Sequence, residues 1–195
     1  MPRKIDHAAR KSQLVDALWA VIHQQGMSAV SLRTVAYSAG VSVGSLRHMF
    51  PTRDALLIHA AELMIERVTE RIQSAQLSGD AISDMTAILM HLVPTDAQSR
   101  SEMEINVALV AESGADPNLI KIRVQAKDEL AGLCEVLLVR LRPDAPQRRV
   151  AARARKVHAL VDGLAFHLVQ SATEADSHWA EEIIQNELKD WASGE

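Results

Sequence analysis

Apolar residues recur at helical spacing along almost the whole chain, and this pattern constrains the fold more than any other feature of the sequence. Near the start, Leu14, Leu18 and Val21 are separated by four and three positions, a spacing that puts their side chains on one face of a helix. The alternating runs of β-branched and aromatic residues that strands need are missing. Strong helix formers such as Ala, Leu, Glu and Arg dominate instead. The sequence therefore predicts an all-α protein.

Glycine and proline residues divide this pattern into separate helices. Gly26 and Gly40 follow the first two helical segments, at the position where a left-handed residue commonly ends a helix. Pro51, Pro94 and Pro143 mark later breaks. The predicted helices cover approximately residues 6–25, 32–39, 43–49, 53–72, 82–92, 102–113, 117–142, 147–173 and 176–191.

The two ends of the chain differ in charge. We expect a helix-turn-helix head over residues 1–52 and a helical body over residues 53–195. Residues 1–56 carry seven Arg and Lys against three Asp, a net charge of +4, whereas the remaining chain carries 14 basic and 22 acidic residues, a net charge of −8. A basic module on an acidic body is typical of a protein that binds phosphate groups through one part, although offsets of this size also arise by chance.

A tight glycine turn joins the second and third predicted helices, which is the arrangement of a helix-turn-helix. Gly40 supplies a backbone conformation that is costly for other residues, and Ala36 is small enough to let the two helices approach each other. Apolar contacts from Val35, Val41 and Leu46 would fix the angle between them. The third helix is then free to enter the major groove of DNA, which is wide enough for one helix.

Several spaced positions of this segment match a known signature at once. The run Ser31–Leu46, followed by Phe50 and by residues 52–57, resembles the helix-turn-helix of the TetR (tetracycline-repressor-like) family of transcriptional regulators. The stretches 46–48 and 162–165 further resemble the betaine-synthesis regulators of that family. The resemblance implies an N-terminal helix-turn-helix head on a C-terminal helical bundle for ligand binding and dimerisation. It also implies a homodimeric regulator, habitually a repressor, that binds a palindromic operator and is released by a small-molecule inducer.

By position in this signature, ten residues are expected to contact double-stranded DNA. Those of the recognition helix read base edges or nearby phosphates, whereas those of the second helix, the fourth helix and the N-terminal arm bind the backbone. Arg47 stands where the family usually has Tyr, so it either reads a guanine edge or holds a phosphate. The expected contacts are Arg3, Lys4, Arg33, Thr34, Val43, Gly44, Ser45, Arg47, His48 and Arg53.

The helix predicted over residues 147–173 is apolar on nearly all sides, so other helices must cover it. A second subunit would provide part of that cover, and paired heads read palindromes. The alternative is an ordinary monomeric core. We expect the basic residues early in this helix to form a solvated face or ion pairs between subunits rather than a second DNA site. The residues expected in the dimer interface are Leu133, Val136, Leu137, Val157, Leu160, Val161, Leu164 and Leu168.

The resemblance also places an inducer pocket among the middle helices. Methionine side chains adapt to varied ligands but are equally common as core filler. Because aromatic residues make up only 3% of the chain, a stacked planar drug or a cation in an aromatic cage is disfavoured. The candidates, with His91 and Glu104 as polar groups, are Met64, Met85, His91, Met103, Glu104, Asn106, Val107, Val110, Ile122 and Phe166.

Other classes of protein leave signatures that are missing here. No apolar run approaches the roughly 20 residues of a transmembrane helix, Met1 is not followed by a signal peptide, and a lone Cys134 cannot form an internal disulfide. We therefore expect a cytoplasmic protein without membrane partners, with a redox role for Cys134 as a minor alternative. His158 and Asp162 are one helical turn apart, but no third metal ligand, phosphate loop or nucleophile turn accompanies them. We expect neither an enzyme nor a cofactor, while a helical protein–protein module and a regulator without an inducer stay open as alternatives.

Overall fold

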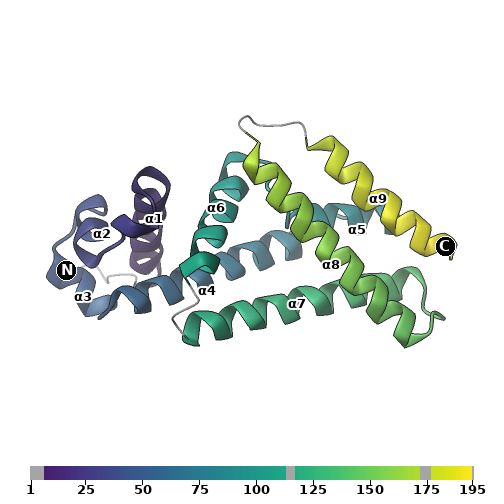
Figure 1. Ribbon diagram of the computed structural model, residues 1–195, viewed down its shortest axis with the longest axis horizontal. Helices are drawn as coiled ribbons and strands as arrows, with labels where there is room; N and C mark the ends of the chain where they lie inside the picture. Colours follow the sequence, from purple (N-terminus) through teal and green to yellow (C-terminus); the bar gives the residue numbers. More distant parts are fainter. Residues whose placement is uncertain (1–6, 113–116, 172–176, 195) are drawn as a thin grey trace, which may run out of the picture. The chain divides into compact units, whose positions relative to one another are not determined.

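The computed structural model describes residues 7–112, 117–171 and 177–194, and all regular secondary structure within these ranges is helical (Figure 1). The prediction of an all-α protein is confirmed. None of the helices in these ranges is long and apolar enough to cross a membrane. The elements are α1 (His7–Gln25), the 3-10 turn η1 (Met27–Ala29), α2 (Leu32–Ser38), α3 (Val43–Met49), α4 (Arg53–Gln73), α5 (Ala81–Met90), α6 (Ala97–Glu112), α7 (Pro117–Leu141), α8 (Gln147–Gln170) and α9 (His178–Ser193).

Most helix boundaries lie close to those predicted, and α6 is the main exception. It begins at Ala97, whereas the apolar pattern predicts a start near residue 102. The reason is a local cap, because the Asp96 carboxylate accepts a hydrogen bond from the backbone N–H of Ser99 at 2.8 Å. This bond satisfies one of the amides that a first helical turn leaves unpaired. The first turn of α6 is polar, so apolar spacing alone does not reveal it.

The chain forms two compact units, each with its own hydrophobic core. Unit 1 contains residues 1–66 and 104–122, and unit 2 contains residues 67–103 and 123–195. Helices α4, α6 and α7 contribute residues to both units. The division describes packing rather than function, so the boundary expected after residue 52 for the DNA-binding domain stays a prediction.

The core of unit 1 holds the first helices in place around the predicted glycine turn. Leu18 of α1 and Leu46 of α3 are completely buried, so the two helices share one apolar interior. Gly40 between α2 and α3 has a φ of +64°, a left-handed conformation that side chains disfavour. The turn is closed by a hydrogen bond of 2.9 Å from the backbone N–H of Val41 to the carbonyl of Ala36. The helix-turn-helix expected from the sequence is therefore formed.

Unit 2 is built around α8 and α9, which pack against α5 and the later part of α7. Trp191, near the end of α9, is 2% exposed. Its indole N–H donates a hydrogen bond of 2.9 Å to the backbone carbonyl of Leu138 in α7. The guanidinium carbon of Arg142 lies 5.1 Å from the indole ring centre, close enough for a cation–π interaction. The tryptophan thus ties the end of the chain to α7.

A largely buried ion pair joins α8 to α9. The Nε atom of Arg153 lies 2.6 Å from Oε1 of Glu187, and the Nζ atom of Lys156 lies 2.7 Å from Oε2 of the same carboxylate. The Glu187 side chain is only 9% exposed. The basic residues early in α8 were expected to face solvent or a second subunit. Arg153 instead binds α9 of the same chain, because the packing of the two helices brings the Glu187 carboxylate within reach. Lys156 reaches the same carboxylate from an exposed position, and Arg148, Arg149 and Arg155 are exposed as expected.

Candidate DNA-binding site

The start of α2 is held by a reciprocal cap that places Arg33 on the surface. The Ser31 hydroxyl accepts a hydrogen bond of 3.1 Å from the backbone N–H of Thr34, and the Thr34 hydroxyl accepts one of 2.9 Å from the backbone N–H of Ser31. Val35 and Ala36 are buried on the inner side of the helix. Arg33 is exposed, so its guanidinium is available to a negatively charged ligand.

The recognition helix α3 is held at its start by Ser42 and in its middle by Leu46, two residues that the sequence singled out. Ser42 caps it by accepting a hydrogen bond of 3.0 Å from the backbone N–H of Ser45. Leu46 is its only fully buried residue. The helix therefore contacts the core along a narrow strip and leaves most of its surface outside.

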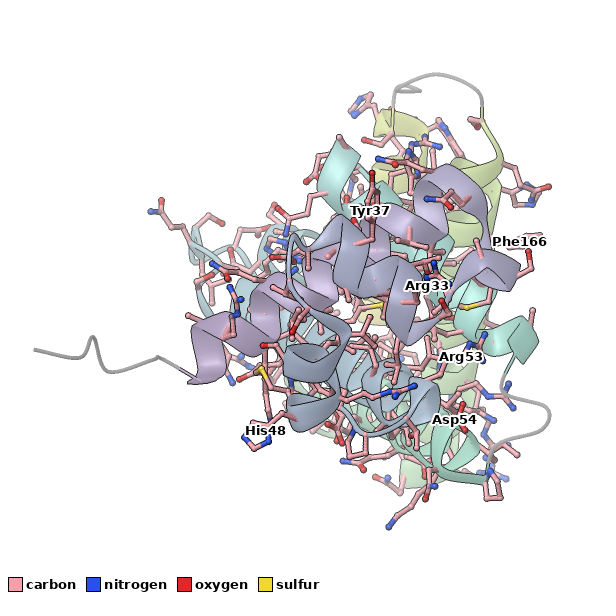
Figure 2. All side chains as sticks on the ribbon, turned by 90° about the vertical axis from the view of Figure 1, so that its left-hand side faces the viewer. Arg33, Tyr37, His48, Arg53, Asp54 and Phe166 are labelled. Atoms are coloured by element: carbon pink, nitrogen blue, oxygen red, sulfur yellow. The ribbon has the colours of Figure 1, made fainter. Side chains whose placement is uncertain are left out.

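The outer surface of α3 carries the side chains expected to read DNA. Gly44, Ser45, Arg47 and His48 are exposed, and Val43 is partly buried against the core. Figure 2 looks onto the end of unit 1 that holds α2 and α3, and Arg33 and His48 are labelled there. Small, hydrogen-bonding and cationic groups on a protruding helix suit base edges in a groove flanked by phosphates.

Two expected backbone contacts also have structural roles. The Thr34 hydroxyl takes part in the cap and donates a hydrogen bond of 2.8 Å to the carbonyl of Ala29, so both its donor and an acceptor position are occupied inside the protein. The Nε atom of Arg53, at the start of α4, donates a hydrogen bond of 3.1 Å to the carbonyl of Val30. Thr34 thus caps α2, and its DNA contact stays a prediction. Arg53 helps to hold the turn before α2, and its DNA contact stays a prediction.

The remaining two expected contacts, Arg3 and Lys4, lie outside the residues that the structure describes. Their proposed role as a basic arm therefore stays a prediction as well.

Comparisons with known proteins bear directly on this site. Residues 14–67, which include the whole helix-turn-helix, match the family model described as bacterial regulatory proteins of the tetR family. Residues 81–192 match the model described as the C-terminal part of BetI-type transcriptional repressors. The chain belongs to the TetR family. The resemblance inferred from the sequence is confirmed, and this TetR-family chain is a transcriptional regulator rather than an enzyme.

Individual relatives cover nearly the whole chain. The HTH-type transcriptional regulator PksA of Bacillus subtilis is 32% identical over 97% of this chain and 93% of its own length. The HTH-type transcriptional regulator BetI of Stenotrophomonas maltophilia is 31% identical over 84% of this chain and 83% of its own. A transcriptional regulator of known structure from Rhodococcus shares the fold, with a TM-score of 0.83 at 24% identity over 94% of this chain and 96% of that one. The TetR-family chain thus has a DNA-binding helix-turn-helix and a C-terminal ligand-binding domain.

The residues expected in a dimer interface are placed differently from the expectation. Most of them face the interior of unit 2, because α5, α7 and α9 of the same chain pack on that side of α8. Side chains that are already buried in one chain have little surface left to bury against another. Only Val136, at 59% exposed, is clearly on the outside. The buried ones are Leu137, Val157, Val161, Leu164 and Leu168, and the partly buried ones are Leu133 and Leu160.

The ten candidates for the inducer pocket fall into both compact units. Glu104 is engaged locally, since its Oε2 lies 2.9 Å from Nδ1 of His23. Met85 is buried in the core of unit 2, whereas Phe166 is 49% exposed. Six of the candidates belong to unit 1 (Met64, Glu104, Asn106, Val107, Val110 and Ile122) and four to unit 2 (Met85, His91, Met103 and Phe166). The pocket stays a prediction.

The structure also shows outward-facing residues that sequence reasoning missed. Tyr37 on α2 is 89% exposed, and Trp179 and Ile183 on α9 are each 39% exposed. A sequence signal existed for Tyr37, because it follows Arg33 by four positions and lies off the buried pair Val35 and Ala36. For α9 the signal was weaker, since its apolar residues occupy more than one face.

The His158–Asp162 pair that raised the enzyme alternative is isolated. The Nε2 atom of His158 lies 3.4 Å from Oδ2 of Asp162 across one turn of α8. Within the parts of the chain that the structure describes, no group of three His, Cys, Asp or Glu side chains is arranged to hold a metal ion. The pair is accounted for as an ordinary contact between residues one helical turn apart, with His158 buried and Asp162 exposed.

Proposed function

We propose that this TetR-family regulator is a homodimeric repressor, acting in the cytoplasm, that binds a palindromic operator and leaves it when a small-molecule inducer binds its C-terminal domain. The observation that carries the proposal is the recognition helix α3, which is anchored by buried Leu46 and exposes Ser45, Arg47 and His48. Such a helix has the width and the chemistry for the major groove.

Each exposed group has a distinct task in this proposal. Arg47 is placed on the last turn of α3, where its fork of N–H donors suits either the O6 and N7 atoms of guanine or a phosphate. Ser45, in the first turn of α3, suits a base edge or a phosphate near it. Arg33, on α2, lies beside a capped helix end and suits the backbone.

We infer a homodimer, which the small size of this reading head and the surface of unit 2 support. One recognition helix contacts only a few base pairs, whereas two related by a two-fold axis and spaced about 34–36 Å apart read a palindrome. Neighbouring helices α8 and α9 expose Phe166, Trp179 and Ile183. Large aromatic side chains left in solvent are typical anchors of a subunit interface. We place the interface on this outer face of α8 and α9, and keep the α7 surface around Val136 as the second candidate.

Helix α6 is our candidate for coupling ligand binding in the C-terminal domain to the DNA-binding head. Within unit 2, Glu102 of α6 accepts two hydrogen bonds from Arg71 of α4, at 2.7 and 3.1 Å. Arg100 of α6 also donates to the carbonyl of Val169, in the last turn of α8, at 3.1 Å and to that of Ser171, just after α8, at 3.0 Å. A ligand that favours one arrangement of these contacts would shift the start of α6.

The other half of α6 belongs to unit 1. Ile105 and Leu109 are buried in the core that also contains α1 and α3, and Glu104 pairs with His23 of α1. Because α6 contributes residues to both units, we infer that a shift at its start alters the packing of the head. We propose this as the basis of induction, with the ligand coupling expressed as a difference in affinity between two arrangements of the dimer.

Selection of duplexes from a random-sequence pool by the purified full-length protein tests the function. We expect enrichment of a palindrome with half-sites about one DNA turn apart, bound with an affinity that falls as salt rises. A size measurement on the complex should give two chains per duplex. No enrichment at low salt would contradict the DNA-binding function, and enrichment of a single half-site bound by one chain would contradict the dimer.

A further inference from the structure

Tyr37 stands apart from the other large apolar side chains of the helix-turn-helix. It is 89% exposed, whereas Val35 and Leu46 are completely buried and Phe50 is 3% exposed. It is also the single tyrosine of the chain. An aromatic ring left in water on a small head contributes nothing to the core, so the ring and hydroxyl of Tyr37 are available to a contact outside the chain.

The position of Tyr37 relative to the proposed DNA contacts narrows the choice of partner. It follows Arg33 by four residues on α2, so the two side chains share one face of the helix. The opposite face, with Val35 and Ala36, is buried. Figure 2 shows Arg33, Tyr37 and His48 on the end of unit 1 that carries α2 and α3. The phenol therefore lies on the same surface as the cationic groups expected to meet DNA.

The chemistry of this surface favours a phosphate over other partners. Arg33 attracts a polyanion, and tyrosine hydroxyls are among the groups that bind DNA phosphates. A phenol donates one hydrogen bond without carrying charge, and its ring covers an apolar stretch of the adjacent sugar. We propose that the Tyr37 hydroxyl donates a hydrogen bond to a backbone phosphate of the operator, next to the phosphate bound by Arg33. The contact rests on the proposed function and adds a residue to it.

Removing only the hydroxyl isolates the proposed bond. Tyr37→Phe should weaken binding of the full-length protein to its enriched duplex about tenfold, the size expected for a hydrogen bond to a charged group. The slope of affinity against salt should not change, because no cation is lost. Binding to a scrambled duplex should fall by a similar factor, since a phosphate contact carries little sequence information. Ser38→Ala, which deletes the exposed hydroxyl of the next residue, is the matched control and should bind like the unaltered protein.

A second readout follows directly from the residue. Because the chain has one tyrosine, incorporation of 3-fluorotyrosine gives a single ¹⁹F resonance. When enough of the enriched duplex is added to bind all of the protein, this resonance should shift or broaden. Unchanged affinity of Tyr37→Phe, or equal weakening by Ser38→Ala, would overturn the contact.

The experiments distinguish a failure of the proposed DNA-binding function from a failure of the Tyr37 contact. If the unaltered protein binds no duplex at all, the proposed function and the contact fall together. If it binds and Tyr37→Phe binds equally well, the contact alone falls. If the resonance responds to protein concentration without DNA, Tyr37 meets a second copy of the chain, and the phosphate contact is again overturned.

Discussion

The helix-turn-helix and the α8–α9 pair differ in how much of each helix is buried. This difference explains where the sequence predicted the exposed surface correctly. Helix α3 is short and buries Leu46 alone, so nearly every other side chain on it is exposed or at the edge of the core. Helix α8 spans Gln147–Gln170 and buries eight of its residues while leaving Phe166 outside. For α3, position in a motif is enough to identify the outer surface. For α8, sequence position does not identify it.

The difference lies in the number of apolar faces. On α8, several faces are apolar, and the side that carries Val157, Val161 and Leu164 is buried because other helices of the same chain pack there. The dimer surface that we propose is the side of α8 that stays exposed and carries Phe166. A helix that is apolar on several sides needs several partners, and only packing shows which partner belongs to which side. The following experiments probe this contrast, beginning with the largest expected effect.

The ion pair between α8 and α9 should matter most to stability. Glu187→Ala leaves Arg153, at 14% side-chain exposure, without its carboxylate. Breaking one side of a buried pair costs about 3–5 kcal/mol. Urea unfolding followed by tryptophan fluorescence in a Trp19→Phe background reports on unit 2, where Trp179 and Trp191 lie. We expect a loss of this size in the free energy of unfolding of unit 2.

Lys156→Ala is the matched control for that experiment. Lys156 contacts the same carboxylate but its side chain is 60% exposed, and exposed ion pairs contribute about 0–1 kcal/mol. An equally large loss in both variants would mean that burial does not set the strength of this network.

The dimer surface can be located by placing a charge on each candidate face. Phe166→Asp should weaken self-association at least about thirtyfold, the effect of removing an interface hot spot. Val136→Asp changes a side chain of greater exposure, 59% against 49%, on α7. It should leave self-association unchanged. Sedimentation over a range of protein concentrations measures both, and the reverse result would move the interface to α7.

Arg47 tests whether the exposed face of α3 reads DNA. Arg47→Ala should cost about 1–3 kcal/mol of operator binding, and the pattern of the loss identifies the contact. Relaxed preference at one base position indicates a guanine, whereas a uniform loss with a salt slope reduced by about one indicates a phosphate. Fluorescence anisotropy with labelled duplexes measures both quantities.

Arg155→Ala provides the comparison for Arg47. Arg155 is an exposed arginine on α8, and its removal should leave both the affinity and the salt slope unchanged. Comparable losses in the two variants would point to overall charge instead of a specific contact.

Cys134 should show the smallest effect, because the structure buries it completely. Burial, followed by the nearby negative charge of Asp162, raises the pKa of its thiol from 9.0 to about 11. The thiolate, which is the reactive form, is therefore scarce at pH 8. We expect no reaction with an aromatic disulfide reagent in the folded protein and one thiol per chain in urea. Rapid modification of the folded protein would revive the redox alternative.

The same shift has a consequence for stability. A thiol whose pKa is raised on folding holds its proton more tightly in the folded state, so its contribution to stability is complete below about pH 9. That contribution is lost as pH rises toward 11, because the unfolded chain ionises first. The difference in unfolding free energy between the unaltered protein and Cys134→Ala should be constant below about pH 9 and shrink as pH rises toward 11.

Much of the reading head was predictable from the sequence because its determinants are local. A glycine turn, a serine cap and the spacing of a few apolar residues specify the α2–α3 hairpin, and Gly40 and Ser42 have the roles expected of them. Thr34 was less predictable. Its hydroxyl binds the carbonyl of Ala29, and a side chain suited to a phosphate is equally suited to a backbone group nearby.

By itself, the sequence determined the all-α class, the helix-turn-helix and the relation to the TetR family, since each depends on neighbouring residues and on fixed spacings. The tertiary structure decided which side of α8 is interior, that Glu187 binds Arg153, and that Tyr37 is left in solvent. The physical reason is that burial is a property of packed helices. Whether a side chain lies inside or outside depends on residues distant in sequence, and no local pattern contains that information.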